Sequence, residues 1–287
     1  MEYVISIDLG ATNLRVGIVS SNLDIIEVNR EKTIKNDKDL LVKQICRLIE
    51  SLPYEKYNVK KVGVSACGFI EKNYIKILPN LGIRDLDLKS IIEKKYGLKT
   101  EIKNDANCTA LAEATFGATK DVKDSFFITI SSGIGGCLIY DGKMVDLAFE
   151  IGHTLIKYNN NLEEFEKIAS GNGIVKLCQD NYLMVDSAPE FFQLCEKKDP
   201  HALNVLDDWK DIIALYLANV QMEYNTDKIV LSGGVVKSSA FFLEDLKIRS
   251  NKLIEKFPLK PINLVLAQFD QDAGLMGGVS VALAIED

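Results

Sequence analysis

The 287-residue chain has no closely paired cysteines, because its six cysteines stand singly and no Cys-x-x-Cys occurs. Zinc ribbons and disulfide frameworks both need cysteines at short, regular spacings. Long apolar runs are also missing: the stretches near 212–220 and 273–285 are too short or too rich in glycine to span a bilayer. Residues 3–7 begin the chain without the pattern of a signal peptide. We therefore expect a cytoplasmic protein.

An excess of positive charge is absent as well. The chain carries 34 basic and 41 acidic residues, a net charge of −7. Nucleic-acid-binding surfaces neutralise phosphates with clustered lysine and arginine, so nucleic acid is not an expected partner. Apolar residues make up 47% of the chain, enough for one large domain or two modest ones. No linker or low-complexity segment separates such domains, which favours two domains packed closely around a cleft.

Two segments repeat the order strand, glycine turn, strand. The first comprises residues 4–8, a turn at 10–12 and residues 14–19; the second comprises 126–130, a turn at 131–136 and 138–140. Alternating β-branched residues support the strands. The repetition indicates a duplicated α/β architecture in which each half holds one side of a phosphate. We also expect helices at 39–51, 88–96, 106–116 and 273–285, a helical region from 162 to 220, strands at 61–65, 100–103 and 228–231, and a loop from residue 67.

The P-loop pattern Gly-x-x-x-x-Gly-Lys-Ser/Thr does not occur, so any phosphate site must be built differently. In the first turn, a strand delivers Asp8, which could bind magnesium, often through water. Gly10 allows backbone amides to approach an anion, while Thr12 and Asn13 add neutral donors and Arg15 a charge. A β-hairpin with a polar turn explains the same pattern equally well.

Two further glycine turns follow apolar strands, at 131–136 and at Ser232-Gly233-Gly234. The first offers three glycines and two hydroxyls as unhindered donors for a phosphate. The second would allow close approach of a base or ribose, although tight packing of a helix on a strand would also explain it. Three glycine turns at strand ends together favour a nucleotide site.

Asp105 ends one expected strand and opens a helix. An ordinary helix N-cap accounts for an aspartate at that position. The alternative is a general base that takes the proton of an alcohol as it attacks a phosphoryl group. Glu150 and His153 could bind hydroxyls, or His153 could be a metal ligand or a structural residue. His201, after Pro200, is interpreted as the start of a helix.

The ordered set of motifs resembles the ROK family (repressors, open reading frames and kinases). The matching segments are Asp8-Leu9-Gly10-Ala11-Thr12, 63–68, Asn104-Asp105-Ala106-Asn107, 132–136, Glu150-Ile151-Gly152-His153, Ser170-Gly171 and 232–235. The resemblance implies an actin-like, hexokinase-type (ribonuclease H-like) duplicated fold with two domains around a cleft. It implies a small domain of 1–108 plus a C-terminal helix at about 275–287, and a large domain of 109–274. The implied activity is ATP-dependent phosphorylation of a sugar.

Position by position, the resemblance assigns roles to individual residues. Asp105 is implied as the catalytic base. The implied sugar contacts are Gly68, Asn104, Asp105, Glu150, His153 and Glu166, the last matching Leu-Glu-x-x-x-Ser-Gly. The implied ATP-binding residues are Asp8, Gly10, Ala11, Thr12, Asn13, Ser132, Gly133, Gly135, Gly233 and Gly234. ATP and Mg²⁺, the latter on Asp8 through water, are the implied cofactors, and a homodimer is the implied assembly.

Three departures from the family pattern bear on these assignments. Most members place a Cys-x-Cys-Gly-x-x-Gly-Cys zinc motif where residues 154–165 contain no cysteine, so only His153 remains and we expect no structural zinc. The lysine that often follows the first threonine is Asn13, which leaves the phosphate charge to magnesium, backbone amides and Arg15. Cys67-Gly68-Phe69 replaces Pro-Gly-Pro.

The substrate is inferred from segments 126–133, 151–155 and 168–174, which look most like bacterial N-acetylmannosamine kinases. We therefore expect transfer to the 6-hydroxyl of N-acetylmannosamine, with glucose, N-acetylglucosamine and allose as alternatives. A sugar-responsive repressor would carry a helix-turn-helix domain first. Because the first glycine turn begins at Asp8 and the chain is acidic, we do not expect one. A sugar-binding module without kinase activity is the remaining alternative.

Overall fold

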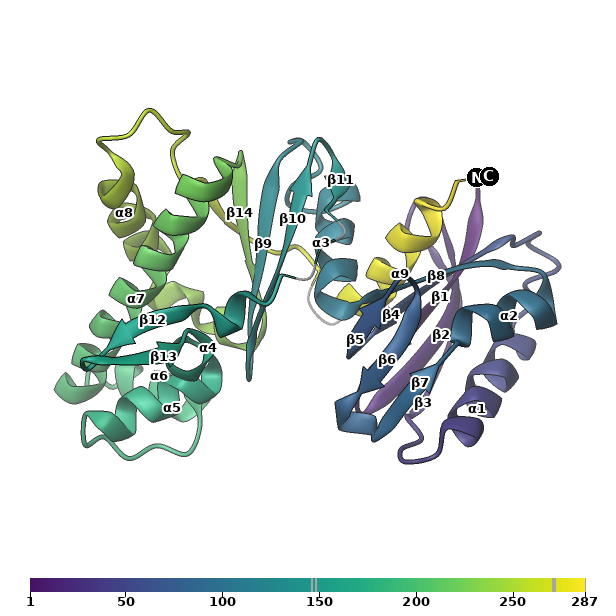
Figure 1. Ribbon diagram of the computed structural model, residues 1–287, viewed down its shortest axis with the longest axis horizontal. Coiled ribbons are helices and arrows are strands. Elements are labelled where there is room, and N and C mark those ends of the chain that lie inside the picture. Colours follow the sequence, from purple (N-terminus) through teal and green to yellow (C-terminus); the bar gives the residue numbers. More distant parts are fainter. Residues whose placement is uncertain (146, 148, 270–271, 287) are drawn as a thin grey trace. The chain divides into compact units, whose positions relative to one another are not determined.

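A computed structural model describes residues 1–145, 147, 149–269 and 272–286 (Figure 1). The chain divides into two compact units, Met1–Thr115 with Gln271–Asp287, and Phe116–Asp270. The expected ranges 1–108 and 109–274 put the division inside helix α3 (Asp105–Thr115), whereas the compact units divide after it. Each unit has its own hydrophobic core.

The first unit is built on a five-stranded sheet of order β3-β2-β1-β4-β8. Strand β1 pairs antiparallel with β2, which pairs antiparallel with β3, whereas β1–β4 and β4–β8 are parallel. The expected strands of this sheet are present, and β3 is an additional one. The bounds are β1 (Tyr3–Leu9), β2 (Asn13–Ser20), β3 (Ile25–Lys32), β4 (Lys61–Ala66) and β8 (Lys99–Asn104).

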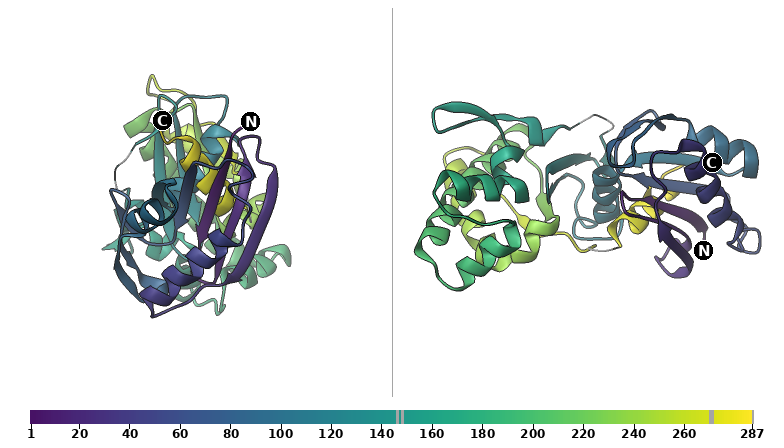
Figure 2. Two further views of the ribbon diagram at one scale, coloured as in Figure 1. Left: turned by 90° about the vertical axis from the view of Figure 1, so that its right-hand side faces the viewer. Right: turned by 90° about the horizontal axis from the view of Figure 1, so that it is seen from below.

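Helices cover both faces of this sheet (Figure 2). Ile5 and Ile7 belong to the core under helices α1 (Lys38–Glu50) and α2 (Leu88–Tyr96). Ser6 alternates to the other face, where its hydroxyl donates to the carbonyl of Leu275 in helix α9 (Ala273–Leu283) at 2.5 Å. The expected small-residue helix at the chain end therefore packs tightly on the sheet, and α3 lies beside it.

The expected loop after residue 67 is wrong, because the segment forms a three-stranded antiparallel sheet. Its strands are β5 (Phe69–Glu71), β6 (Tyr74–Leu78) and β7 (Ile83–Leu86), with a 3₁₀ turn at Pro79–Leu81. Lys72 and Asn73 both have positive φ, 48° and 66°, as the two central residues of a tight hairpin turn require. These strands are too short to show a clear period in the sequence.

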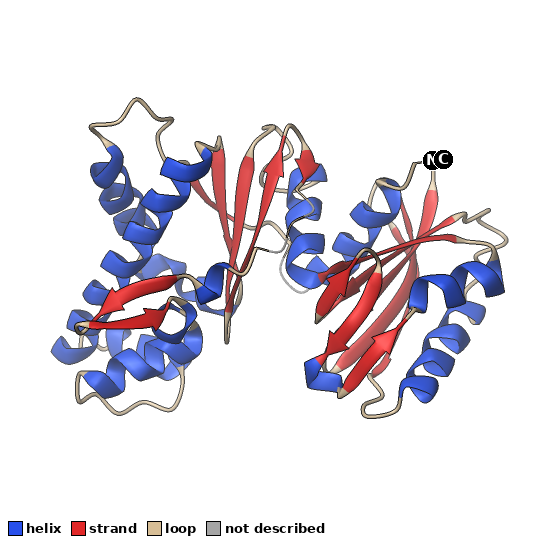
Figure 3. Cartoon of the chain, in the orientation of Figure 1, coloured by secondary structure: helices blue, strands red, loops and turns tan. Residues whose placement is uncertain are grey.

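The second unit repeats the sheet of the first (Figure 3). Its strand order is β11-β10-β9-β14-β15, with antiparallel pairs β9–β10 and β10–β11 and parallel pairs β9–β14 and β14–β15. The bounds are β9 (Ser125–Ile130), β10 (Ile134–Tyr140), β11 (Lys143–Met144), β14 (Lys228–Ser232) and β15 (Leu264–Leu266). The same order and the same sequence of directions occur in both units, which confirms the predicted duplication.

Helices account for most of the remaining second unit. The expected helical region of 162–220 is wrong at its start, because residues 162–164 belong to β13 (Asn161–Glu164), which forms a hairpin with β12 (Leu155–Tyr158). The helices are α4 (Glu166–Ala169), α5 (Gly171–Asp180), α6 (Ala188–Glu196), α7 (Pro200–Tyr224) and α8 (Leu243–Ile254), with 3₁₀ turns at Ile151–His153 and Gly234–Phe241. The prediction that His201 starts a helix is confirmed. The Asp199 side chain caps α7 and accepts a hydrogen bond from the backbone amide of His201.

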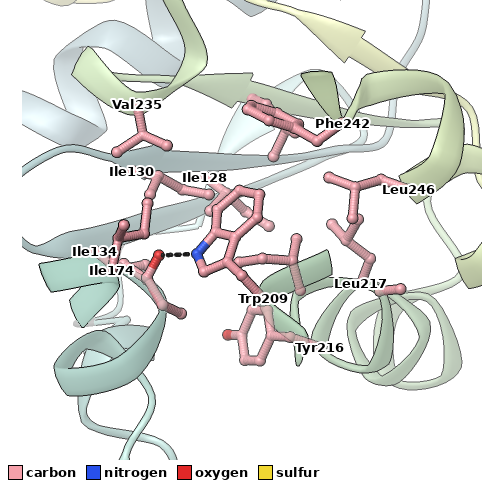
Figure 4. Close-up of a cluster of buried hydrophobic side chains, with 14 of the residues drawn as sticks. Ile128, Ile130, Ile134, Ile174, Trp209, Tyr216, Leu217, Val235, Phe242 and Leu246 are labelled. Carbon is pink, nitrogen blue, oxygen red and sulfur yellow. Dashed lines mark hydrogen bonds between the residues drawn. The ribbon is translucent and has the colours of Figure 1, made fainter. Parts of the chain in front are cut away.

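The core of this unit centres on Trp209 of α7 (Figure 4). Its indole Nε1 donates to the carbonyl of Ala169 at 2.9 Å, while its ring packs edge-on against Phe242. Ala169 closes helix α4, so this hydrogen bond attaches that short helix to the longest helix of the unit. None of the helices in the described part of the chain is long and apolar enough to cross a membrane.

Candidate functional site

Asp8 stands near the carboxyl end of β1 and is bound by Arg15, its cross-strand partner in β2. Arg15 donates to Asp8 Oδ2 through Nε at 3.0 Å and lies 2.8 Å from it through Nη2, while its Nη1 bonds to Asp272 Oδ1 at 2.8 Å. Burial raises the pKa of Asp8, and the Arg15 charge opposes that rise. The predicted metal ligand is thus held in place by an arginine that is itself anchored by a second carboxylate.

The first glycine turn is closed by its own backbone and by β3. Gly10 donates its amide to the carbonyl of Asn13 at 3.1 Å, and Thr33 bonds to the Thr12 and Gly10 carbonyls at 3.0 and 2.7 Å. The guanidinium of Arg30 donates to Asn13 Oδ1 at 3.3 Å. In this turn Ala11 is half-buried and Thr12 is exposed. The position where the family often has lysine therefore carries an asparagine with an arginine bonded to it.

Asp105 is the first residue of α3, and its carboxylate accepts from the amide of Ala106 at 2.9 Å. Asn104 supports the same helix start, since its Oδ1 also accepts from Ala106 and its Nδ2 donates to the Gly68 carbonyl at 2.9 Å. Burial raises the pKa of Asp105, and the negative charge of Asp8 raises it further. Asp105 nevertheless remains exposed to solvent, which moderates this rise.

Gly68 sits where a side chain would not fit. A Cβ added there would lie 2.8 Å from Leu78 Cδ2 and 3.1 Å from Leu78 Cα. The preceding Cys67 donates its amide to the Leu9 carbonyl at 3.2 Å, and burial raises the pKa of its thiol to about 11. Cys67 is therefore a neutral, unreactive thiol at neutral pH.

These groups meet because β1, β4 and β8 are adjacent parallel strands. Leu9 pairs with Ala66, which pairs with Asn104, so the three strands end in register. The carboxyl ends of parallel strands are where open α/β sheets bind their ligands. Asp8, Gly68 and Asp105 thus share one edge of the first unit's sheet, an arrangement that can place a base and a metal ligand next to each other.

The second glycine turn is fixed to the start of helix α5. Ser131 donates its amide to the Gly133 carbonyl at 2.9 Å and accepts from the amide of Gly171 at 2.7 Å. Ser170 caps α5 by accepting from Gly173 at 3.0 Å. The Ser132–Gly135 segment is thereby held against the N-terminus of a ten-residue helix, whose partial positive charge favours an anion nearby.

Glu166, at the start of α4, lies against this turn. Its Oε2 accepts from the backbone amide of Ile134 at 3.2 Å. A Cβ added at Gly133 would stand 2.8 Å from the same oxygen, and one at Gly152 3.0 Å from it. Both glycines are therefore needed to leave room for the carboxylate. The predicted sugar glutamate and the predicted phosphate glycine lie in direct contact within the second unit.

His153 ends the 3₁₀ turn that Glu150 opens, and its amide donates to the Glu150 carbonyl at 3.0 Å. Its ring Nδ1 lies 3.1 Å from Glu164 Oε2, an interaction that raises the pKa of His153, to which the Glu166 and Glu150 charges add. Glu164 was not predicted. The hairpin around Asn159-Asn160 could have indicated it, since a two-residue turn there pairs residue 155 with residue 164.

One group of described residues could bring three metal-ligand atoms together: one atom each from His153, Glu164 and Glu166 lies within 4.8 Å of the other two. The set supplies one nitrogen and two oxygens and no sulfur. Two of its members already bond to each other, which satisfies them without an ion.

A cavity of about 500 Å³ opens beside the second and third glycine turns. Its wall includes Ser132 and Gly234 and an apolar side formed by Pro189 and Phe192, with Asp186 at the same cavity. The third turn requires glycine: Gly233 has φ +99° and a Cβ there would lie 2.6 Å from the carbonyl carbon of Ile130. An apolar slot flanked by glycine turns and one carboxylate suits a flat base attached to a ribose.

The two units have the same strand order. One carries carboxylates at its strand ends, and the other carries glycine turns beside a cavity. This arrangement defines a protein of the actin-like, hexokinase-type fold class. Within that class the ROK family model matches residues 4–285, and the chain belongs to the ROK family. The predicted fold class is confirmed.

Relatives with known roles include both enzymes and regulators. The N-acetylmannosamine kinase of Salmonella heidelberg is 29% identical over 293 residues, covering 97% of each chain. The xylose repressor of Bacillus subtilis is 25% identical over 297 residues, covering 98% of this chain and 77% of the repressor. Among solved structures, a Streptomyces griseus glucokinase in complex with glucose and AMPPNP superposes with a TM-score of 0.73 at 22% identity, covering 98% and 99% of the two chains.

Proposed function

We propose that this protein is an ATP-dependent sugar kinase that phosphorylates the 6-hydroxyl of a hexose or N-acetylhexosamine, with N-acetylmannosamine as the preferred substrate. The observation that carries the proposal is the position of Asp105, an accessible carboxylate of raised pKa at the shared edge of β1, β4 and β8, beside Asp8. Phosphoryl transfer needs mainly positioning and charge neutralisation, so one such base suffices for the hydroxyl.

Asp105 would accept the proton of the sugar's 6-hydroxyl as the oxygen attacks the γ-phosphorus. A raised pKa suits a general base, because it strengthens the proton affinity of the carboxylate. The hydrogen bond from the Ala106 amide fixes the Asp105 carboxylate. Asn104 donates to the Gly68 carbonyl, which holds the start of the helix in place.

Asp8 would hold Mg²⁺, directly or through water, as hard oxygen ligands do. The carboxylate fits this role because it lies beside the Gly10 turn and is kept in position by Arg15. When bound, the ion neutralises charge on the β- and γ-phosphates. The amides of residues 10–13 would hold one side of the phosphates, and Arg15 and Arg30 place two cations near this turn in the absence of the usual lysine.

In the second unit, Ser132, Gly133 and Gly135 would hold the other side of the phosphates at the N-terminus of α5. The cavity bounded by Gly234 and Phe192 would take the nucleoside, with Gly233 allowing its close approach.

The residues proposed to bind sugar hydroxyls are those that the family resemblance implies: Glu166, His153, Glu150, Asn104 and Gly68. Charged side chains accept and donate strongly to hydroxyls, which gives such a site its specificity. N-acetylmannosamine is placed first because the Salmonella kinase aligns over nearly the whole chain. Action in the cytoplasm, where ATP is available, and a homodimeric assembly complete the proposal.

The test measures ADP release with ATP and Mg²⁺ against N-acetylmannosamine, N-acetylglucosamine, glucose, mannose and allose. We expect the highest kcat/KM with N-acetylmannosamine, complete loss of turnover on chelation with EDTA, and recovery on adding Mg²⁺. Preference for another hexose would retain the kinase and replace the substrate. Sugar binding by calorimetry without turnover of any sugar would refute the kinase and favour the regulatory role that the xylose repressor relative represents.

A further inference from the structure

The strands β12 and β13 form a short hairpin that brings two ionisable side chains together. Asn159 and Asn160 both have positive φ, 46° and 64°, and form its two-residue turn. This turn fixes the register, so that Leu155 pairs with Glu164 and the amide of Phe165 donates to the Thr154 carbonyl at 2.8 Å. Thr154 directly follows His153, so His153 lies just beyond the end of the hairpin, two residues before the cross-strand partner of Glu164, and its ring contacts the Glu164 carboxylate.

Phe165 holds this end of the hairpin to the core. It is buried, and its ring stacks on Tyr216 of α7 with 4.1 Å between centroids and 17° between planes. Glu164 and Glu166 flank it on either side along the chain. Because Phe165 is anchored in the core, the backbone on both sides of it is held in place. Glu164 then contacts His153, and Glu166 accepts from the amide of Ile134.

Glu164 uses its two oxygens for two different partners. Oε2 lies 3.1 Å from His153 Nδ1, and Oε1 lies 3.2 Å from the ammonium of Lys167, the residue three positions further along the chain. The two bonds lower the pKa of Glu164, so the group is ionised at neutral pH and can only accept. Nδ1 of His153 must then carry the hydrogen, and Nε2 is the ring nitrogen that Glu164 leaves available.

We infer that Glu164 is a positioning residue of the sugar site, which fixes the ring orientation of His153 and keeps a hydrogen on its Nδ1, so that Nε2 is the nitrogen that faces the substrate hydroxyls. This inference rests on the proposed sugar-kinase function. An imidazole that is free to rotate would present either nitrogen, and the entropy lost on ordering it would weaken sugar binding. A carboxylate bonded to the second nitrogen removes that freedom before the sugar arrives.

The experiment compares Glu164→Ala and Glu164→Gln with Glu163→Gln as a matched control. Glu163 lies next to Glu164 on the same strand and pairs with Ile156. We expect Glu164→Ala to raise the KM for sugar by about tenfold while the KM for ATP stays within about twofold, as loss of one charge-assisted hydrogen bond predicts. Glu164→Gln keeps an oxygen acceptor for Nδ1–H and should restore most of the affinity, and Glu163→Gln should match the wild type.

A second measurement tests the tautomer without any kinase assay. The chain has two histidines, so ¹⁵N NMR of the imidazoles gives one signal set from His153 and one from His201 as an internal reference. In spectra recorded at alkaline pH, where the rings are neutral, we expect the hydrogen of His153 on Nδ1 in the wild type and a shift toward the Nε2–H tautomer in Glu164→Ala, with His201 unchanged. An unchanged His153 spectrum in that variant, or an equal rise in both KM values, would overturn the inference. Should the wild type phosphorylate no sugar, the kinase proposal fails, while the spectra still decide whether Glu164 sets the tautomer.

Discussion

Gly274, in the first turn of α9, lies directly against the carboxylate of Asp8, although 266 positions separate them in the sequence. A Cβ at residue 274 would stand 2.5 Å from Asp8 Cγ and 2.8 Å from its Oδ2. The carboxylate, Arg15 and Asp272 are thus held in one place by β1, β2 and the start of α9. Any side chain at residue 274 has to displace Asp8.

Gly274→Ala should therefore abolish the proposed kinase activity through displacement of Asp8 and not through unfolding. Alanine favours a helix over glycine by about 1 kcal/mol, so α9 itself is not weakened. A carboxylate moved by about 1 Å can cost on the order of 10²-fold in rate. We expect a loss of that size in kcat together with a raised requirement for Mg²⁺, and a circular dichroism spectrum like that of the wild type. Wild-type kinetics in this variant would contradict the role of Asp8.

Asp105→Asn should retain the fold and most of the sugar affinity and lose nearly all turnover. The amide keeps the shape of the side chain but cannot take a proton, and a positioned general base contributes about 10²–10⁴-fold. Because the pKa of Asp105 is raised by burial, replacing the charge with a neutral amide should leave the melting temperature unchanged or higher. Calorimetric sugar binding and ADP release distinguish these effects. Turnover within a few fold of the wild type would exclude Asp105 as the base.

The pH dependence of kcat/KM should show an acid limb set by Asp105. Burial and then the charge of Asp8 raise its pKa above the ordinary 3.8, and the base is active only when deprotonated. Activity should thus fall as the pH drops through this raised pKa, with a midpoint above 3.8. Rates measured from pH 4 to 8 with pH-jump controls for stability check this. A midpoint at or below 3.8 would show that burial does not control the group.

Glu166→Ala should affect the sugar much more than the nucleotide. The carboxylate is in contact with Gly133 and Gly152 and accepts from Ile134, so its removal empties the space between the two glycine segments. We expect the KM for sugar to rise by about tenfold or more, as removal of a charged hydrogen-bonding group predicts. Glu166→Gln keeps the acceptor for the Ile134 amide and serves as the control for local structure. An unchanged sugar KM in Glu166→Ala would remove this residue from the site.

Much of the secondary structure could be predicted because it is encoded locally. Strands β1 and β2 follow from alternating β-branched residues, and α2 from a periodic segment ended by Gly97, which adopts the left-handed conformation with φ +67°. The small sheet β5-β6-β7 could not be predicted, because strands of three to five residues are too short to establish a period. The β12–β13 hairpin was missed for the same reason.

The sequence by itself determined which chemical groups are available and in what order: carboxylates after strands, three glycine turns, one histidine between glutamates, and no cysteine beside it. The tertiary structure alone decided which of these groups touch. Arg15 meets Asp272, Gly274 meets Asp8 and Glu164 meets His153 only because strands pair in one register and α9 returns to the first sheet. The physical reason is that periodicity and turn chemistry act over a few residues, whereas contacts between distant residues depend on how whole elements pack.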